Sequence, residues 1–139
     1  MSTSKPEAAA DSRTVVMVIE PEVLIRMTVA AYLRECGYKV IEGVVAADVW
    51  TVLEAAVRLD VLFCEVQLPG GTDGFSLARR LRQTHPAIDV ILASGVAGAA
   101  EKSKDLCEEG PMEKPYKAAD VAARIRVLLE RRKASAGKS

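Results

Sequence analysis

The sequence predicts an α/β domain built on a parallel sheet with helices on both faces. Short apolar runs rich in β-branched residues alternate five times with segments of helical spacing, a pattern typical of repeated β/α units with right-handed crossovers. The chain has 139 residues, half of them hydrophobic, which is enough for one domain with its own core. We expect a disordered N-terminus over residues 1–12, a stand-alone domain over 13–132 and a disordered tail over 133–139.

The apolar runs give the predicted strands. They cover Val15–Ile19, Tyr38–Ile41, Val61–Glu65, Val90–Ala93 and, more weakly, Met112–Glu113. Each is bounded by polar or turn-forming residues, so we expect short strands that are buried in the middle of a sheet.

Helical spacing fills the gaps between these strands. In the first gap, Gly37 stands where a glycine commonly follows a helix, after an apolar stripe made of Ile25, Val29, Tyr32, Leu33 and Cys36. Similar stripes lie within 46–57, 77–81 and 121–129. The fourth gap, 97–107, is poorly patterned and rich in small residues, so a short and mobile helix is expected there.

Composition argues against several classes of function. Lys plus Arg and Asp plus Glu are both 19, and aromatic residues make up only 4%, which disfavours binding to nucleic acid. No apolar stretch approaches the roughly 20 residues of a membrane span, and the polar start does not resemble a secretory signal. We therefore expect a cytoplasmic protein that contacts neither nucleic acid nor membrane.

Acidic residues and one lysine fall at the ends of the predicted strands. Glu65 closes the third apolar run, Glu20 and Glu22 follow the first, and Lys114 precedes Pro115 after the last. The carboxyl ends of parallel strands meet at one edge of the sheet, where such folds place their chemistry. We therefore expect the carboxylates and the lysine to converge, and Glu65 to form an ion pair with Lys114.

The order of these features resembles the receiver domain of two-component response regulators. The features are the acids after the first strand, Glu65 before Leu68–Pro69–Gly70, the pair Asp73–Gly74, the pair Ser94–Gly95 and the pair Lys114–Pro115. Singly these motifs are weak, but their order and spacing over about residues 13–131 are specific. The resemblance implies a flavodoxin-like fold with strand order 2-1-3-4-5.

The resemblance also implies roles for individual residues. In the family, the acid that ends the third strand is an aspartate that takes up a phosphoryl group, and here that position is Glu65. The hydroxyl that binds the phosphoryl group corresponds to Ser94, and the lysine that pairs with it corresponds to Lys114. The switch aromatic, three residues before that lysine, falls on Pro111.

The family's Mg²⁺ site is only partly matched. Its first acid corresponds to Glu20, but its second falls on Pro21, which has no carboxylate. A residual site would use Glu20, Glu22 and Glu65 as oxygen ligands. Glu20 and Glu22 are explained equally well as acids at a helix N-terminus, and Ser94 as a turn or cap residue.

The departures at Glu65, Pro21 and Pro111 affect one mechanism. They predict a non-enzymatic signalling module of a two-component or phosphorelay pathway that acts by protein contact without standard aspartate phosphorylation. The glutamate carboxylate, one methylene further out, would partly imitate the charge of an aspartyl phosphate. The expected partner is a histidine kinase, a phosphotransferase or a downstream effector, docked on the first helix or on the surface over about 97–129.

Two other functions remain open from the sequence. The domain is a genuine phosphoacceptor if Glu65 takes up phosphate with Mg²⁺ bound by the nearby acids. The fold would also allow a flavodoxin-like binder of a small ligand such as a flavin. No Ser/Thr-rich phosphate loop follows Ile19, however, and few aromatic residues are available to stack on a flavin ring.

Overall fold

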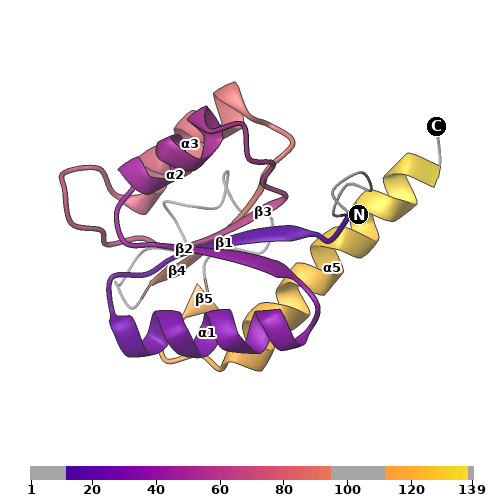
Figure 1. Ribbon diagram of the computed structural model, residues 1–139, viewed down its shortest axis with the longest axis horizontal. Coiled ribbons are helices and arrows are strands. Elements are labelled where there is room, and N and C mark those ends of the chain that lie inside the picture. Colours follow the sequence, from indigo (N-terminus) through magenta and orange to yellow (C-terminus); the bar gives the residue numbers. More distant parts are fainter. Residues whose placement is uncertain (1–11, 95–111, 138–139) are drawn as a thin grey trace, which may run out of the picture.

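The computed structural model describes residues 12–94 and 112–137, which form a parallel sheet between two layers of helices (Figure 1). The sheet has five strands in the order β2-β1-β3-β4-β5, all paired in parallel. The strands are β1 (Val15–Ile19), β2 (Lys39–Gly43), β3 (Val61–Glu65), β4 (Asp89–Ser94) and β5 (Met112–Glu113). The predicted fold class and strand order are confirmed.

The described helices cover both faces of this sheet. They are α1 (Val23–Glu35), α2 (Ala47–Glu54), α3 (Gly74–Thr84) and α5 (Ala118–Gly137). Figure 1 shows α1 and α5 on one face and α2 and α3 on the other. The helix expected within 97–107 and the switch position Pro111 both lie outside the described residues.

The central strands are buried on both sides. Val16 and Phe63 pack in the cluster shared with α1 and α5, whereas Met17 and Leu62 pack in the cluster shared with α2 and α3. Successive side chains of a strand point to opposite faces, so a strand covered by helices on both sides reads as a continuous apolar run. This is why the sequence predicted the bounds of β1 and β3 to the residue.

Helix α1 differs in detail from its predicted stripe. Val29, Ala30 and Leu33 are buried, while Tyr32 and Cys36 are exposed because the face of the helix turned to the sheet is narrower than the pattern suggested. The helix ends as predicted at Gly37, which has a φ of 99° that side-chain-bearing residues rarely adopt. The Gly37 amide donates to the Arg34 carbonyl and the next amide donates to the Leu33 carbonyl, as in a Schellman end.

The tail predicted over 133–139 is wrong for residues 133–137, because α5 continues to Gly137. Arg132 anchors this end of the helix to the sheet: its Nε lies 2.8 Å from Oδ2 of Asp89, and its Nη2 donates to the Asp60 carbonyl at 3.1 Å. Contacts between distant segments therefore support a helix whose composition alone looked disordered. Residues 1–11 and 138–139 lie outside the described residues. In the described part of the chain, no helix has the length and apolar composition to cross a bilayer.

Candidate functional site

Four of the predicted site residues lie at the carboxyl edge of the sheet. Glu20 directly follows β1, Glu65 ends β3, Ser94 ends β4 and Lys114 directly follows β5. Glu20 is 1% exposed, Glu65 4% and Ser94 3%, although all three are polar. Because the strands are parallel, their carboxyl ends share this edge. The predicted convergence of the carboxylates and the lysine is confirmed by the ion pairs of Lys114 with Glu20 and Glu65.

Lys114 bridges the two buried glutamates. Its Nζ lies 3.0 Å from Oε1 of Glu20 and also forms a close ion pair with Oε1 of Glu65. The second oxygen of each carboxylate accepts a backbone N–H, from Glu22 and Gln67 respectively, each at 2.9 Å. The predicted pair of Glu65 with Lys114 is confirmed. The pair with Glu20 was not predicted. Together, the two ion pairs and the two backbone N–H bonds contact all four carboxylate oxygens of Glu20 and Glu65.

The charges of the cluster are balanced only in part. Burial lowers the pKa of Lys114, but its contacts with Glu65 and Glu20 outweigh that effect, so the pKa lies above the ordinary value. Lys114 is therefore charged at neutral pH, with its side chain 22% exposed. One ammonium faces two buried carboxylates, which leaves a formal charge of −1 for the backbone amides to stabilise.

Tyr116 is a site residue that the sequence reasoning missed. Its ring packs edge-on against Phe63 at 5.4 Å, and its buried hydroxyl has no hydrogen-bond partner among the described residues. Burial raises the pKa of Tyr116, and the negative charges of Glu20 and Glu65 raise it further. The one available signal was its position two residues after Lys114, in the turn that leads into α5.

Ser94 supports the main chain of the lysine. Its backbone carbonyl accepts the N–H of Lys114 at 3.4 Å, beside the pairing of Ser94 with Glu113 in the sheet. The peptide bond between Lys114 and Pro115 is cis. Ser94 therefore lies where the resemblance placed it, at the end of β4 next to the lysine.

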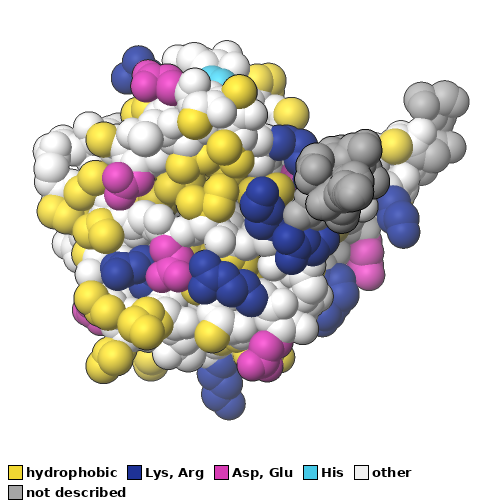
Figure 2. Space-filling view, in the orientation of Figure 1, with side chains coloured by type: hydrophobic (Ala, Val, Ile, Leu, Met, Phe, Trp, Pro, Cys, Tyr) yellow, Lys and Arg dark blue, Asp and Glu magenta, His cyan; other side chains and the backbone are white. Residues whose placement is uncertain are grey.

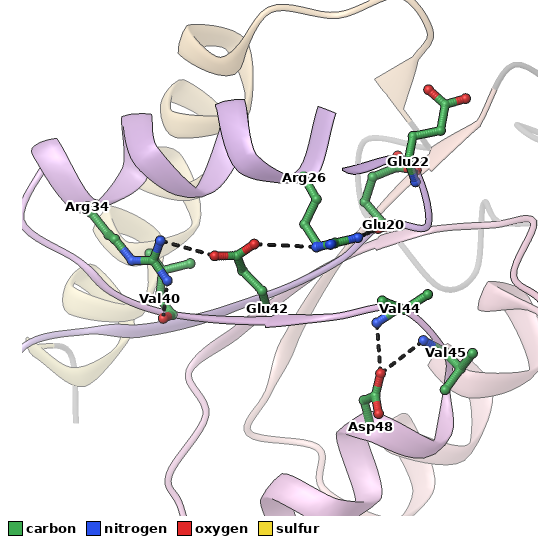
Figure 3. A network of polar contacts seen from close by, with 9 residues as sticks. All are labelled: Glu20, Glu22, Arg26, Arg34, Val40, Glu42, Val44, Val45 and Asp48. Atoms are coloured by element: carbon green, nitrogen blue, oxygen red, sulfur yellow. Dashed lines mark hydrogen bonds and ion pairs between the residues drawn. The ribbon is translucent and has the colours of Figure 1, made fainter. Parts of the chain in front are cut away.

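Glu22 does not join the buried cluster. It is exposed, it stands at the N-cap of α1, and Figure 3 shows its side chain pointing away from Glu20. Only its backbone N–H takes part, by donating to Glu20.

The residues present do not fit a magnesium ion. Mg²⁺ requires oxygen ligands in an octahedral arrangement, yet the Lys114 ammonium contacts both Glu20 and Glu65, and Pro21 offers no carboxylate. Within residues 12–94 and 112–137, no group of three or more His, Cys, Asp or Glu side chains is placed to hold a metal. The arrangement is that of an internal ion cluster.

A second network fixes the Glu20 main chain (Figure 3). Arg26 on α1 donates from Nη1 to the Glu20 carbonyl at 2.8 Å, and its Nε lies 3.3 Å from Oε1 of Glu42 on β2. Glu42 also pairs with Arg34 at 3.1 Å. Arg26 is thus a positioning residue for the strand end, and only its place near Glu20 in the sequence hinted at this role.

The start of α3 packs closely against the main chain at the end of β3. Asp73 caps this helix by accepting the Ser76 N–H at 2.8 Å, and the Gly74 N–H donates to the Val66 carbonyl at 2.7 Å. A Cβ atom at Gly74 would lie 2.6 Å from the Glu65 carbonyl oxygen. The glycine therefore permits an approach of helix to strand that no other residue allows.

We expect Gly74→Ala to lower the free energy of unfolding by about 1–3 kcal/mol, because the added methyl overlaps backbone that cannot easily move. Urea denaturation measures the effect. Ser76→Ala, at an exposed position of the same helical turn, is the control and is expected to change stability by no more than about 0.5 kcal/mol. Equal stabilities of wild type and Gly74→Ala would contradict the close approach.

Comparisons with known proteins agree with this geometry. The profile of the response regulator receiver domain family matches residues 16–126. The sensor kinase CckA of Brucella abortus is 30% identical over 132 residues, which cover 91% of this chain and 14% of that protein. The KDP operon transcriptional regulatory protein KdpE of Escherichia coli is 32% identical over 125 residues, covering 88% of this chain and 54% of that protein.

Solved structures show the same fold. A CheY-like receiver domain protein from Methanospirillum hungatei superimposes with a TM-score of 0.80 at 17% identity, over 89% of this chain and 99% of that one. The chain spans about half, or less, of the length of the curated relatives that it matches.

Proposed function

Because the chain belongs to the response regulator receiver domain family, we propose that it is a receiver module of a two-component pathway that signals by protein contact without aspartyl phosphorylation. One observation carries the proposal: the carboxylate at the phosphoacceptor position, Glu65, is engaged on both oxygens, by Lys114 and by the Gln67 N–H. Contacts of this kind on both oxygens lower the nucleophilicity of the carboxylate toward a phosphodonor.

The longer side chain of glutamate supports the same reading. At the end of β3 its carboxylate reaches Lys114 directly, so the lysine has a permanent anionic partner. In the family this lysine pairs with the phosphoryl group. A fixed carboxylate in that place holds the module in one state, and partner binding would then depend on the presence of the module rather than on its modification.

The first turns of α1 offer a contact surface for a partner. Leu24 is 80% exposed, Val23 and Met27 are more than half exposed, and Figure 2 shows hydrophobic side chains gathered over this end of the helix. Next to them lies a cavity of about 210 Å³ lined by Leu24, Ile25, Thr28, Val29, Tyr116 and Ala118. Exposed apolar surface beside a cavity is typical of a protein interface. A histidine kinase, a phosphotransferase or an effector with an apolar helix face would fit it.

The test of the proposal is the absence of a phosphoryl adduct. We expect wild-type protein incubated with acetyl phosphate and Mg²⁺ to keep its unmodified mass, because Glu65 is already engaged and Pro21 supplies no ligand. A receiver domain with aspartate at the corresponding position, treated in parallel, should gain one phosphoryl group. An adduct mapped to Glu65 by mass spectrometry would refute the proposal and establish the phosphoacceptor alternative.

The contact surface is tested separately, with Leu24→Glu as the disrupting variant. Val127→Glu on α5 is the control, since Val127 is also exposed but does not line the cavity. We expect wild type and Val127→Glu to capture a kinase, a phosphotransferase or an effector, and Leu24→Glu to lose it. Equal capture by all three proteins would place the contact elsewhere.

A further inference from the structure

We propose that the Lys114 ammonium is the built-in counter-ion of the acid cluster and excludes a divalent cation from it. The inference deepens the proposed function, on which it rests for the family assignment, by stating how the site balances its charge. It concerns the ion that the wild-type cluster accepts, whereas the proposed function concerns the phosphoryl group.

The geometry of the carboxylates carries this inference. One nitrogen, Nζ of Lys114, contacts an oxygen of Glu20 and an oxygen of Glu65, and so lies between the two acids. This single positive charge lies within ion-pair distance of both carboxylates. A magnesium ion that used the same two oxygens would have to displace Lys114.

The remaining oxygens are no easier to reach. Oε2 of Glu20 accepts the Glu22 N–H and Oε2 of Glu65 accepts the Gln67 N–H, both at 2.9 Å. Binding of a cation through these atoms would leave two backbone donors without their acceptors, which costs free energy in a buried site. The neighbouring residue Pro21 contributes no oxygen from its side chain to offset that loss.

Charge argues in the same direction. The Lys114 ammonium lies within ion-pair distance of both carboxylates, so a divalent cation in the same cluster would face a like charge at short range. The main chain of Lys114 is tied to Ser94 at the end of β4, which limits how far the side chain can withdraw. In the wild-type cluster, where glutamate at position 65 reaches the ammonium and Pro21 replaces an acid, lysine and divalent cation are therefore alternatives.

The first test uses wild-type protein and Mn²⁺, whose unpaired electrons broaden nearby NMR signals. We expect the backbone amides of Glu22, Gln67 and Lys114 to be broadened no more than those beside exposed acids such as Asp120. The melting temperature should be the same with Mg²⁺ as with Na⁺ at matched ionic strength. Selective broadening at the three amides that Mg²⁺ reverses would overturn the inference.

The second test removes the ammonium with Lys114→Met, which keeps the length of the side chain. Freed of their counter-ion, the two glutamates should bind a divalent cation, so Mg²⁺ should raise the melting temperature of this variant by several degrees. The control, Lys117→Met, loses the same charge at an exposed position and should show no such shift. An Mg²⁺-independent melting temperature in Lys114→Met would show that Lys114 is not what excludes the cation.

Failure of this inference and failure of the proposed function are distinguishable. Site-specific Mn²⁺ binding without any phosphoryl adduct would refute only the counter-ion role of Lys114. An adduct on Glu65 would refute the proposed function whatever the cation measurements show. If Lys114→Met does not fold, the broadening measured on wild type still decides the matter.

Discussion

Lys114→Met is expected to lower the free energy of unfolding by about 3–5 kcal/mol, the cost of leaving buried charge without its partner. Glu20 and Glu65 are almost completely buried, and Lys114 is the cation that contacts both. For a domain whose whole stability is on the order of 5–15 kcal/mol, this is a large fraction. Chemical denaturation at neutral pH measures it.

Two matched variants identify the cause. Lys117→Met, on an exposed residue three positions later, should change stability by no more than about 0.5 kcal/mol. Adding Glu20→Gln and Glu65→Gln to Lys114→Met should restore much of the loss, because neutral amides need no counter-ion and still accept the backbone N–H bonds. If Lys114→Met were as stable as wild type, the two ion pairs of Lys114 would contribute nothing to the free energy of unfolding.

The same ion pairs make stability depend on pH in the alkaline range. The pKa of Lys114 is raised above the ordinary value of 10.5 in the folded protein, so folding favours the protonated amine. This contribution is fully present below the unfolded pKa and is lost as the pH rises through the higher folded value. Wild type should therefore lose more stability than Lys114→Met between neutral pH and pH above 10.5. Parallel curves for the two proteins would contradict the raised pKa.

The second large effect concerns phosphorylation, which we expect only when two positions are changed together. Pro21→Asp with Glu65→Asp rebuilds the family's pair of carboxylates and shortens the acceptor by one methylene, which draws it back from Lys114. Acyl-phosphate formation needs both a placed nucleophile and a cation that neutralises the phosphoryl oxygens, so the two requirements act as a unit. Mass spectrometry after treatment with acetyl phosphate and Mg²⁺ should show one adduct on the double variant.

The single variants are the controls for this result. Neither Glu65→Asp nor Pro21→Asp alone is expected to gain an appreciable adduct, since each supplies one requirement without the other. An adduct on Glu65→Asp alone would show that Pro21 is no obstacle and that the glutamate by itself silences the site. No adduct on the double variant would place the obstacle elsewhere in the domain.

The pattern of apolar residues was sufficient for the sheet where strands are covered on both faces. The bounds of β1 and β3 were predicted to the residue, as were those of the two-residue edge strand β5, whereas the central strand β4 extends one residue beyond each predicted end. β2 was predicted to end at Ile41 but runs to Gly43, because it is an edge strand and its outer residues Lys39 and Glu42 are polar. The extent of β2 is set by its pairing with β1. Such pairing does not require a continuous apolar run in the sequence.

In the candidate site, too, some features were predictable from the sequence and others were not. Strand ends in a parallel sheet share one edge, so acids and a lysine that follow apolar runs had to come close together, and the pair of Glu65 with Lys114 followed from position alone. The choice of Glu20 as a second partner, the turn of Glu22 toward solvent and the approach of Tyr116 depended on side-chain directions. Those directions are set by packing between segments far apart in the chain. The extension of α5 likewise depends on contacts of Arg132 with Asp60 and Asp89. Contacts between distant segments cannot be predicted from the local sequence pattern.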